Sequence, residues 1–137
     1  MHFYNITLML NRASEQRRLH TATHGQAARE VIEHIARRHA KVYAWVVMPD
    51  HIHLLFSRAK PLANVEKFAG RIKRLINKAL AMRGLHKLKW REGCVSYLVD
   101  ASTLAQAKQH ILANPVRGGL AETPDDYALG GAPEPLP

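Results

Sequence analysis

The chain has 137 residues, of which 47% are hydrophobic and 23% are charged, a balance typical of one folded domain that excludes a disordered chain. No apolar run reaches the roughly 18 residues that a membrane span needs, so we expect no membrane partner. Twenty Lys and Arg against eleven Asp and Glu give a net charge of +9. This charge indicates a polyanionic partner such as nucleic acid, and a basic enzyme of another kind is the alternative.

The N-terminal residues and the cysteine content indicate the compartment. No basic segment followed by a long apolar one is visible at the N-terminus, so we expect no secretory signal. The single cysteine, Cys94, excludes an intramolecular disulfide and any multi-cysteine zinc or iron–sulfur site. We therefore expect a cytoplasmic protein, associated with the nucleoid if its partner is DNA.

The first third of the chain predicts a strand and a helix. Residues 3–10 place an apolar side chain at every second position, which is the pattern of a strand with one buried face. A polar loop is expected over residues 11–24. Between residues 28 and 36, apolar side chains recur at helical spacing with charged ones between them, which predicts an amphipathic helix.

The middle of the chain predicts a hairpin and a second helix. Residues 43–48 and 51–56 are aromatic and β-branched runs, and a two-residue turn joins them. The next helix is expected from about Pro61, since proline is favoured in a first helical turn, to Met82, and Gly84 ends it.

The last third predicts a strand, a helix and a tail. Residues 95–99 form the fourth predicted strand, and either Asp100 or Ser102 caps a helix that reaches about Ala113. An Asn-Pro dipeptide stops that helix. We divide the chain into a functional domain over residues 1–120 and a C-terminal tail over residues 121–137.

This order of elements predicts the fold class. Strand, helix, strand, strand, helix, strand is the ferredoxin-like βαββαβ order, an α+β fold with an antiparallel sheet and helices on one face. The C-terminal helix is an addition to that order. The other face of the sheet is then free to carry a site.

Two histidines on the predicted third strand form a candidate metal site. Side chains alternate along a strand, so His51 and His53 point to one face, whereas Ile52 points to the other and anchors the strand in the core. Two such imidazoles can converge on one divalent cation, with a third ligand from elsewhere. The alternative is a pair of half-exposed histidines that hold no metal.

The second predicted helix carries a basic stripe. Four cations lie within an arc of about 60° opposite its apolar face, with no acid among them. They are Lys67, Arg71, Arg74 and Lys78. A phosphate backbone would neutralise their mutual repulsion, and the alternative is a solvated helix face.

Two aromatic residues near further cations, Trp90 and Tyr97, allow two interpretations. They could stack on unpaired bases, or they could simply pack against the sheet. An RNA-binding domain of this fold would need stacking aromatics on its central strands, where this chain has His51 and His53 instead.

Two segments resemble a known family. Residues 44–55 read AWVVMPDHIHLL and residues 111–120 read ILANPVRGGL. The first resembles the signature strand pair of the single-tyrosine transposases that carry a His-hydrophobic-His (HUH) motif. The second resembles an element of their bacterial REP-associated branch, and the similarity extends from Tyr4 to about Tyr127.

This resemblance implies a metal-dependent endonuclease and strand transferase that acts on single-stranded DNA beside small, REP-like hairpins. His51 and His53 would hold Mg²⁺ or Mn²⁺, with Asn114 as the third ligand. A tyrosine on the last helix would attack the phosphate and form a 5′-phosphotyrosine. We assign DNA binding to the basic stripe and to Arg117. The resemblance leaves a monomer or a homodimer open.

The chain departs from the family at the nucleophile. Four residues before the Asn of Asn-Pro, the family has tyrosine and this chain has His110. His110 could be a replacement nucleophile, an extra ligand or general base, or a change that has impaired cleavage. Among the tyrosines of this chain, Tyr97 is the candidate to replace the missing nucleophile. The alternative function is a non-catalytic protein, derived from a transposase, that binds hairpin or single-stranded DNA.

Overall fold

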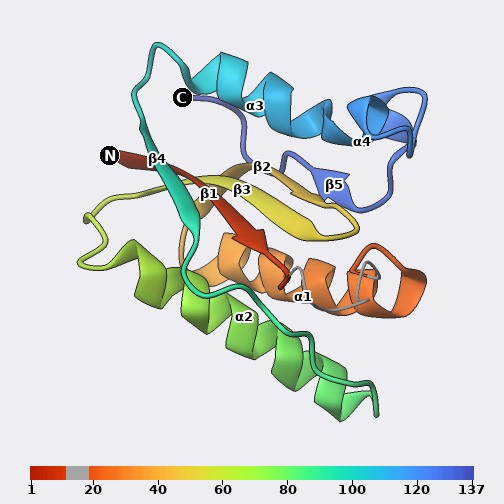
Figure 1. Ribbon diagram of the computed structural model, residues 1–137. Helices are drawn as coiled ribbons and strands as arrows, with labels where there is room; N and C mark the ends of the chain where they lie inside the picture. Colours follow the sequence, from red (N-terminus) through yellow and green to blue (C-terminus); the bar gives the residue numbers. More distant parts are fainter. Residues whose placement is uncertain (12–18) are drawn as a thin grey trace.

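The computed structural model describes residues 1–11 and 19–137, and part of the predicted loop over residues 11–24 lies outside these ranges. Figure 1 shows the elements in chain order. They are β1 (His2–Met9), α1 (Ala22–Arg38), β2 (Lys41–Val47), β3 (His51–Arg58), α2 (Val65–Met82), β4 (Val95–Val99), α3 (Leu104–Leu112), α4 (Asn114–Arg117), the 3₁₀ turn η1 (Pro124–Asp126) and β5 (Gly130–Gly131). No helix in the described ranges is long and apolar enough to cross a bilayer.

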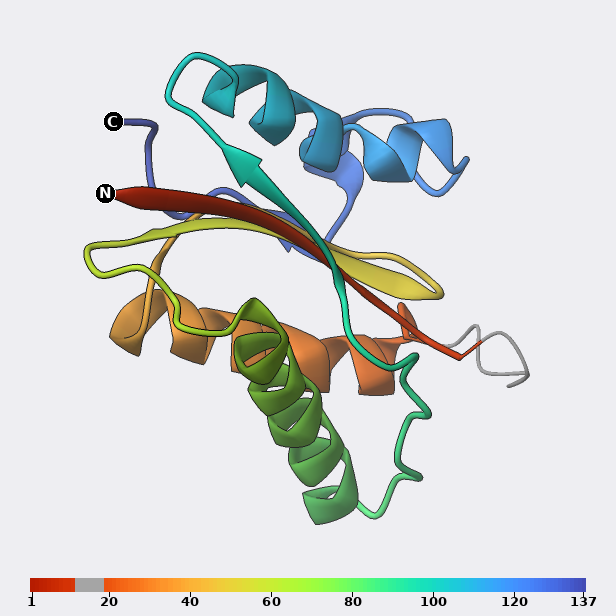
Figure 2. The ribbon, with the colours of Figure 1, turned by 60° about the vertical axis from the view of Figure 1, so that its left-hand side comes forward.

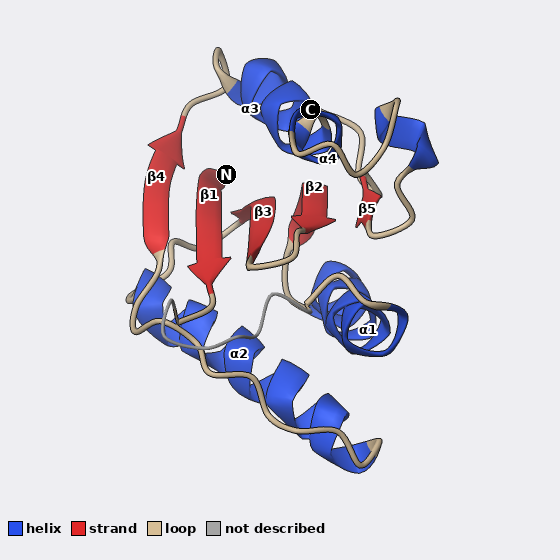
Figure 3. Cartoon of the chain, turned by 45° about the vertical axis from the view of Figure 1, so that its right-hand side comes forward, coloured by secondary structure: helices blue, strands red, loops and turns tan. Residues whose placement is uncertain are grey.

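The strands form one antiparallel sheet in the order β4-β1-β3-β2-β5. Helices α1 and α2 cover one face, and α3 and α4 lie on the other (Figures 2 and 3). The first four strands therefore have the predicted ferredoxin-like arrangement, and the predicted α+β fold class is confirmed. The face that the βαββαβ order leaves free is partly covered by the C-terminal helix.

Two apolar clusters join the layers. The larger lies between the sheet and helices α1 and α2, and β3 contributes Ile52, Leu54 and Phe56 to it. The smaller lies between the sheet and α3 and contains Leu55 of β3 together with Ile111 of α3. Because side chains alternate along β3, its two histidines lie on the same face as Leu55, toward α3.

The first two helices begin at other residues than the sequence predicted. α1 begins at Ala22, so the polar loop ends three residues earlier than predicted. α2 begins at Val65 rather than near Pro61, because Asn64 is its N-cap. The Asn64 side-chain oxygen accepts a hydrogen bond from the Lys67 backbone N–H at 3.1 Å, which satisfies one of the free donors of the first turn.

The N-cap of the third helix is neither of the two predicted residues, Asp100 and Ser102. α3 begins at Leu104, with Thr103 at the cap position. The Asp100 carboxylate accepts hydrogen bonds from the Thr103 backbone N–H at 3.0 Å and the Ser102 hydroxyl at 2.5 Å, so it fixes the turn ahead of the helix instead. The Asn-Pro dipeptide ends α3, as predicted, and it also starts the short helix α4.

The C-terminal tail returns to an edge of the sheet. β5 pairs with β2, the Tyr127 hydroxyl donates a hydrogen bond to the Val47 carbonyl, and the Glu134 backbone N–H donates to the Val42 carbonyl at 3.0 Å. Backbone and side-chain hydrogen bonds therefore hold the tail along β2, at the edge of the sheet opposite to β4.

Removing the Phe56 ring is expected to destabilise the fold by about 3–5 kcal/mol, because the surrounding rings cannot close the cavity that is left. Phe56 is fully buried between Tyr4 and Phe68, whose ring centroids lie 5.2 Å and 5.0 Å from its own. Urea denaturation of Phe56→Ala measures the free energy of unfolding. Met82→Ala is the control, because Met82 is 79% exposed and should cost under about 0.5 kcal/mol. Equal effects of the two changes would contradict the packing described.

Candidate active site

Two imidazoles lie side by side at the start of β3. The His51 and His53 rings have centroids 4.8 Å apart and planes at 87°, and both side chains are half-buried on the face toward α3. The sequence predicted this shared face from strand alternation. The structure places the pair on one of the three inner strands of the sheet, where the backbone on both sides is hydrogen-bonded. The pair is therefore held on a rigid element.

Each imidazole is anchored through its Nδ1 atom. His51 Nδ1 lies 2.7 Å from Asp50 Oδ1, and His53 Nδ1 lies 2.9 Å from Thr7 Oγ1. An ionised carboxylate only accepts, so His51 Nδ1 carries the proton and its Nε2 has a free lone pair. A proton on His53 Nδ1, donated to the hydroxyl, leaves that Nε2 free in the same way. A histidine whose Nδ1 is held by a hydrogen bond, so that its Nε2 is free, is typical of metal ligands.

The surroundings of His53 keep it neutral. Burial is the main cause that lowers the pKa of its imidazole to about 4, with smaller electrostatic contributions from His51, His110 and Arg117 included in that value. A pKa this low leaves the ring unprotonated at neutral pH, which is the form that binds a metal. The same interactions show that α3 and α4 bring His110 and Arg117 close to the histidine pair.

His110 and Arg117 contact one another across the junction of α3 and α4. Arg117 Nη2 lies 3.3 Å from His110 Nε2 and donates a hydrogen bond to the His110 carbonyl at 2.9 Å. A guanidinium only donates, so the Nε2 lone pair of His110 accepts from Arg117. His110 is exposed.

The third predicted ligand, Asn114, begins α4. Its Nδ2 atom is buried and has no hydrogen-bond partner within residues 1–11 and 19–137, and a buried donor without a partner costs free energy. At the other end of α4, a Cβ on Gly118 would lie 3.1 Å from Met48 Cε, which places this helix against the hairpin that leads into His51.

The donors present fit a divalent cation without His110. Among the described residues, no three His, Cys, Asp or Glu side chains come together as a metal-binding group, so His110 does not complete a triad with the pair. The unpartnered amide of Asn114 exchanges its N and O by a flip and can present an oxygen. Two imidazoles and one amide oxygen are a suitable partial ligand set for such a cation.

The basic stripe lies in the other layer. Its four cations are exposed along α2, on the opposite face of the sheet from the histidine pair, whereas Arg117 lies beside the pair. Lys73 of the same helix is buried instead, and its Nζ donates to the carbonyls of Arg91 at 2.8 Å and Gly93 at 2.5 Å. Lys73 therefore holds the segment that leads into β4.

The two aromatic candidates differ in exposure. Trp90 is half-buried against the larger core cluster, and its Nε1 is buried without a partner, which agrees with packing rather than base stacking. Tyr97 is 62% exposed on β4. The strand register pairs it with Asn5 of β1, two strands away from the histidines.

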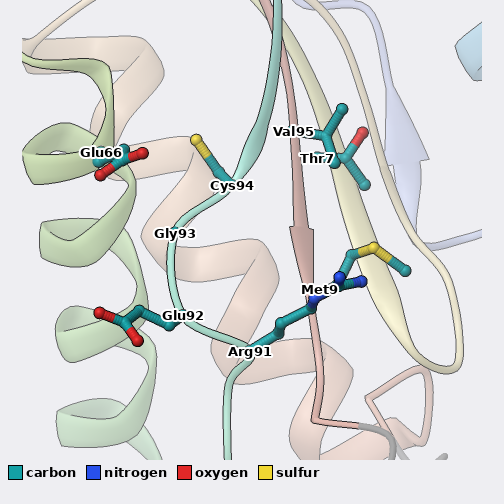
Figure 4. Close-up of a pocket in the computed structure, with 8 residues that line it drawn as sticks. All are labelled: Thr7, Met9, Glu66, Arg91, Glu92, Gly93, Cys94 and Val95. Atoms are coloured by element: carbon teal, nitrogen blue, oxygen red, sulfur yellow. The ribbon is translucent and has the colours of Figure 1, made fainter.

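A hollow of about 200 Å³ beside Thr7 is not part of this site (Figure 4). Glu66 and Glu92 line it together with Arg91, so two carboxylates stand against one cation in its wall. Burial raises the pKa of the Cys94 thiol in its wall, which keeps that thiol protonated and unreactive at neutral pH.

Sequence reasoning missed two residues that orient the pair. Asp50 directly precedes His51, and a carboxylate next to a candidate ligand is a signal that the sequence contains. Thr7 gave no such signal, because its contact with His53 depends on the register between β1 and β3, across 46 residues of chain.

Comparisons with known proteins agree with this geometry. The family model described as "Transposase IS200 like" matches residues 3–114. A REP-associated tyrosine transposase, solved bound to a REP hairpin, is similar with a TM-score of 0.73 and 24% identity, over 94% of this chain and 75% of that one. A protein from Deinococcus radiodurans R1 described as a transposase is similar with a TM-score of 0.52 and 19% identity, over 81% of this chain and 88% of that one. No curated protein matches.

The two solved structures are similar in fold, and the family model adds the sequence pattern. That model covers most of the chain, including β1, the strand pair with both histidines, and α3. The resemblance read from the sequence motifs is thereby confirmed at the level of the family. This chain belongs to the IS200-like transposases.

Proposed function

We propose that this protein is a metal-dependent endonuclease and strand transferase that acts on single-stranded DNA beside a REP-like hairpin. The observation that carries the proposal is the anchored pair of His51 and His53, with His110 and Arg117 near enough to act electrostatically on His53. The similar REP-associated transposase was solved with such a hairpin, which supports this class of substrate.

The chain's own residues would divide the work as follows. Asp50 and Thr7 orient the two imidazoles, and these with the Asn114 amide would hold Mg²⁺ or Mn²⁺. When bound, the cation polarises the scissile phosphate and stabilises its developing negative charge. Arg117 neutralises a phosphate oxygen near residue 110, and a bidentate guanidinium suits that task.

One observation favours a second candidate, a non-catalytic protein that binds hairpin or single-stranded DNA. The His110 Nε2 lone pair accepts a hydrogen bond from Arg117, so it is occupied rather than available for attack on phosphorus. In this candidate the protein keeps the metal and DNA sites of a transposase and has lost covalent strand transfer.

The test is incubation of an end-labelled hairpin oligonucleotide, with single-stranded flanks, with the protein and Mn²⁺ or with a chelator. Denaturing gels report both nicked DNA and any DNA that remains attached to protein. We expect Mn²⁺-dependent nicking at one site for the enzyme, at a rate limited by the missing tyrosine. His51→Ala should abolish it.

The two candidates give different gels. Tight hairpin binding with no nick and no adduct supports the non-catalytic candidate. Nicking that persists in the chelator, or in His51→Ala, would overturn the metal role. Absence of binding to any hairpin or single strand would overturn both candidates.

A further inference from the structure

A second concentration of positive charge lies at the far end of the sheet from the histidines. A hollow of about 530 Å³ lies where α1 ends, β2 begins and β3 ends. Six basic side chains line it, and no Asp or Glu lies among its described lining residues. They are Arg37, Arg38, His39, Lys41, Arg58 and Lys60.

The five Arg and Lys side chains of this set are cations, and the protein itself neutralises them poorly. Among the described residues, only Arg37 of the six has a carboxylate within salt-bridge distance, Glu33 Oε2 at 4.0 Å. Arg58 lies over the Phe68 ring, with its guanidinium carbon 5.8 Å from the ring centroid. Like charges held this close repel one another unless an anion occupies the space between them.

The hollow lies next to the basic stripe on α2. Burial lowers the pKa of the His39 imidazole, and nearby positive charges lower it further; the largest of these contributions comes from Arg71. Arg71 is a member of the stripe and lies on the neighbouring helix. Arg58 of the hollow also lies over the Phe68 ring of that helix, so the hollow and the stripe are neighbours.

We propose that this hollow binds phosphates of the double-stranded stem of a hairpin, while the single-stranded flank reaches the histidine pair. The inference rests on the proposed function and adds where the stem docks. Sites for single strands combine cations with aromatic platforms, and the described lining of this hollow includes no Phe, Tyr or Trp. A duplex presents a phosphate charge every 1.7 Å or so along its axis, which suits a dense cluster of cations.

The distance between the two sites limits the ligand. His51 and Arg58 are the first and last residues of β3, seven steps apart at about 3.3 Å each, or roughly 23 Å. A duplex rises about 3.4 Å per base pair, so this separation equals the length of roughly seven base pairs. A stem of ten base pairs is therefore a suitable probe.

The experiment compares two double variants that each remove two charges. Lys41→Gln/Lys60→Gln changes the hollow, and Lys87→Gln/Lys108→Gln changes two lysines elsewhere. Fluorescence anisotropy measures the affinity of each for a ten-base-pair hairpin with a single-stranded flank and for an unpaired oligonucleotide of equal length. A salt series gives the slope of log affinity against log salt.

We expect the hollow variant to bind the hairpin about tenfold or more weakly. Its salt slope should fall by about 1.8, since each phosphate contact contributes about 0.9. The unpaired oligonucleotide should change less than twofold, and the control variant should match the unmodified protein on both DNAs.

Four outcomes would overturn the inference. Equal losses for the two variants would show an effect of net charge alone, and equal losses for the two DNAs would show that the hollow does not select a duplex. If the unmodified protein nicks and binds the hairpin and the Lys41→Gln/Lys60→Gln variant binds it equally well, this inference is overturned and the proposed function is left intact. An unmodified protein that binds no DNA would overturn both.

Discussion

His110→Tyr is expected to raise cleavage of a hairpin-bearing oligonucleotide by roughly 10³-fold or more and to create a covalent protein–DNA adduct. The phenolate oxygen would form a bond to phosphorus as the bond to the 3′ oxygen breaks, which leaves a free 3′ hydroxyl. Arg117 is already in place, since its Nη2 lies 3.3 Å from His110 Nε2. A cation at that distance would lower the pKa of the new phenol and favour its nucleophilic form.

The measurement is a denaturing gel that resolves free DNA, nicked DNA and DNA attached to protein. His110→Phe is the matched control, because phenylalanine has the ring of tyrosine without its phenolic oxygen. We expect an adduct only from the tyrosine variant, and only with Mn²⁺ present. An adduct of equal yield from His110→Phe would show that the nucleophile lies elsewhere, and an adduct from the unmodified chain that His110→Phe loses would show that His110 itself is the nucleophile.

His53→Ala is expected to weaken binding of Mn²⁺ by at least roughly 100-fold, because it removes an imidazole that is held neutral and oriented. A lost second-shell contact alone typically costs 10–100-fold in metal affinity. We therefore expect Thr7→Val, which removes only the hydroxyl next to His53 Nδ1, to lie between His53→Ala and the unmodified protein. This graded order follows from the 2.9 Å contact between the two side chains.

Isothermal titration calorimetry with Mn²⁺ measures these affinities, and circular dichroism shows whether each variant is folded. His86→Ala is the control, since His86 is an exposed histidine in the segment after α2. A His53→Ala protein that is folded and binds Mn²⁺ as tightly as the unmodified chain would remove the basis for the metal site. A Thr7→Val protein with unchanged affinity would contradict the orienting role of the hydroxyl.

The local patterns of this sequence predict its elements and half of the site. Alternation placed Ile52 in the core and both histidines on the other face, because the side-chain period of a strand is two whatever the rest of the fold does. The order of elements also predicted the sheet, since few topologies join these elements without crossings. Helix ends were less predictable. α2 begins after Asn64 rather than near Pro61, because the Asn64 side chain accepts a hydrogen bond from a backbone N–H of the first turn.

Contacts between segments far apart in the chain could not be read from the sequence. The hydrogen bond between Thr7 and His53 requires the register of β1 against β3. The position of the basic stripe relative to His51 requires knowing which face of the sheet α2 covers. The cations around His39 come from the ends of α1 and β3 and from Arg71 on α2, and only the fold brings them together.

The bonds between the C-terminal tail and β2 have a consequence for solubility. An uncovered outer strand offers its free backbone groups to other molecules and templates intermolecular β-pairing. In this chain, the tail occupies the Val42 carbonyl and both the N–H and the carbonyl of Val47. A protein shortened ahead of Tyr127 would present those groups to its neighbours, so the last residues protect the molecule from polymerising through that strand.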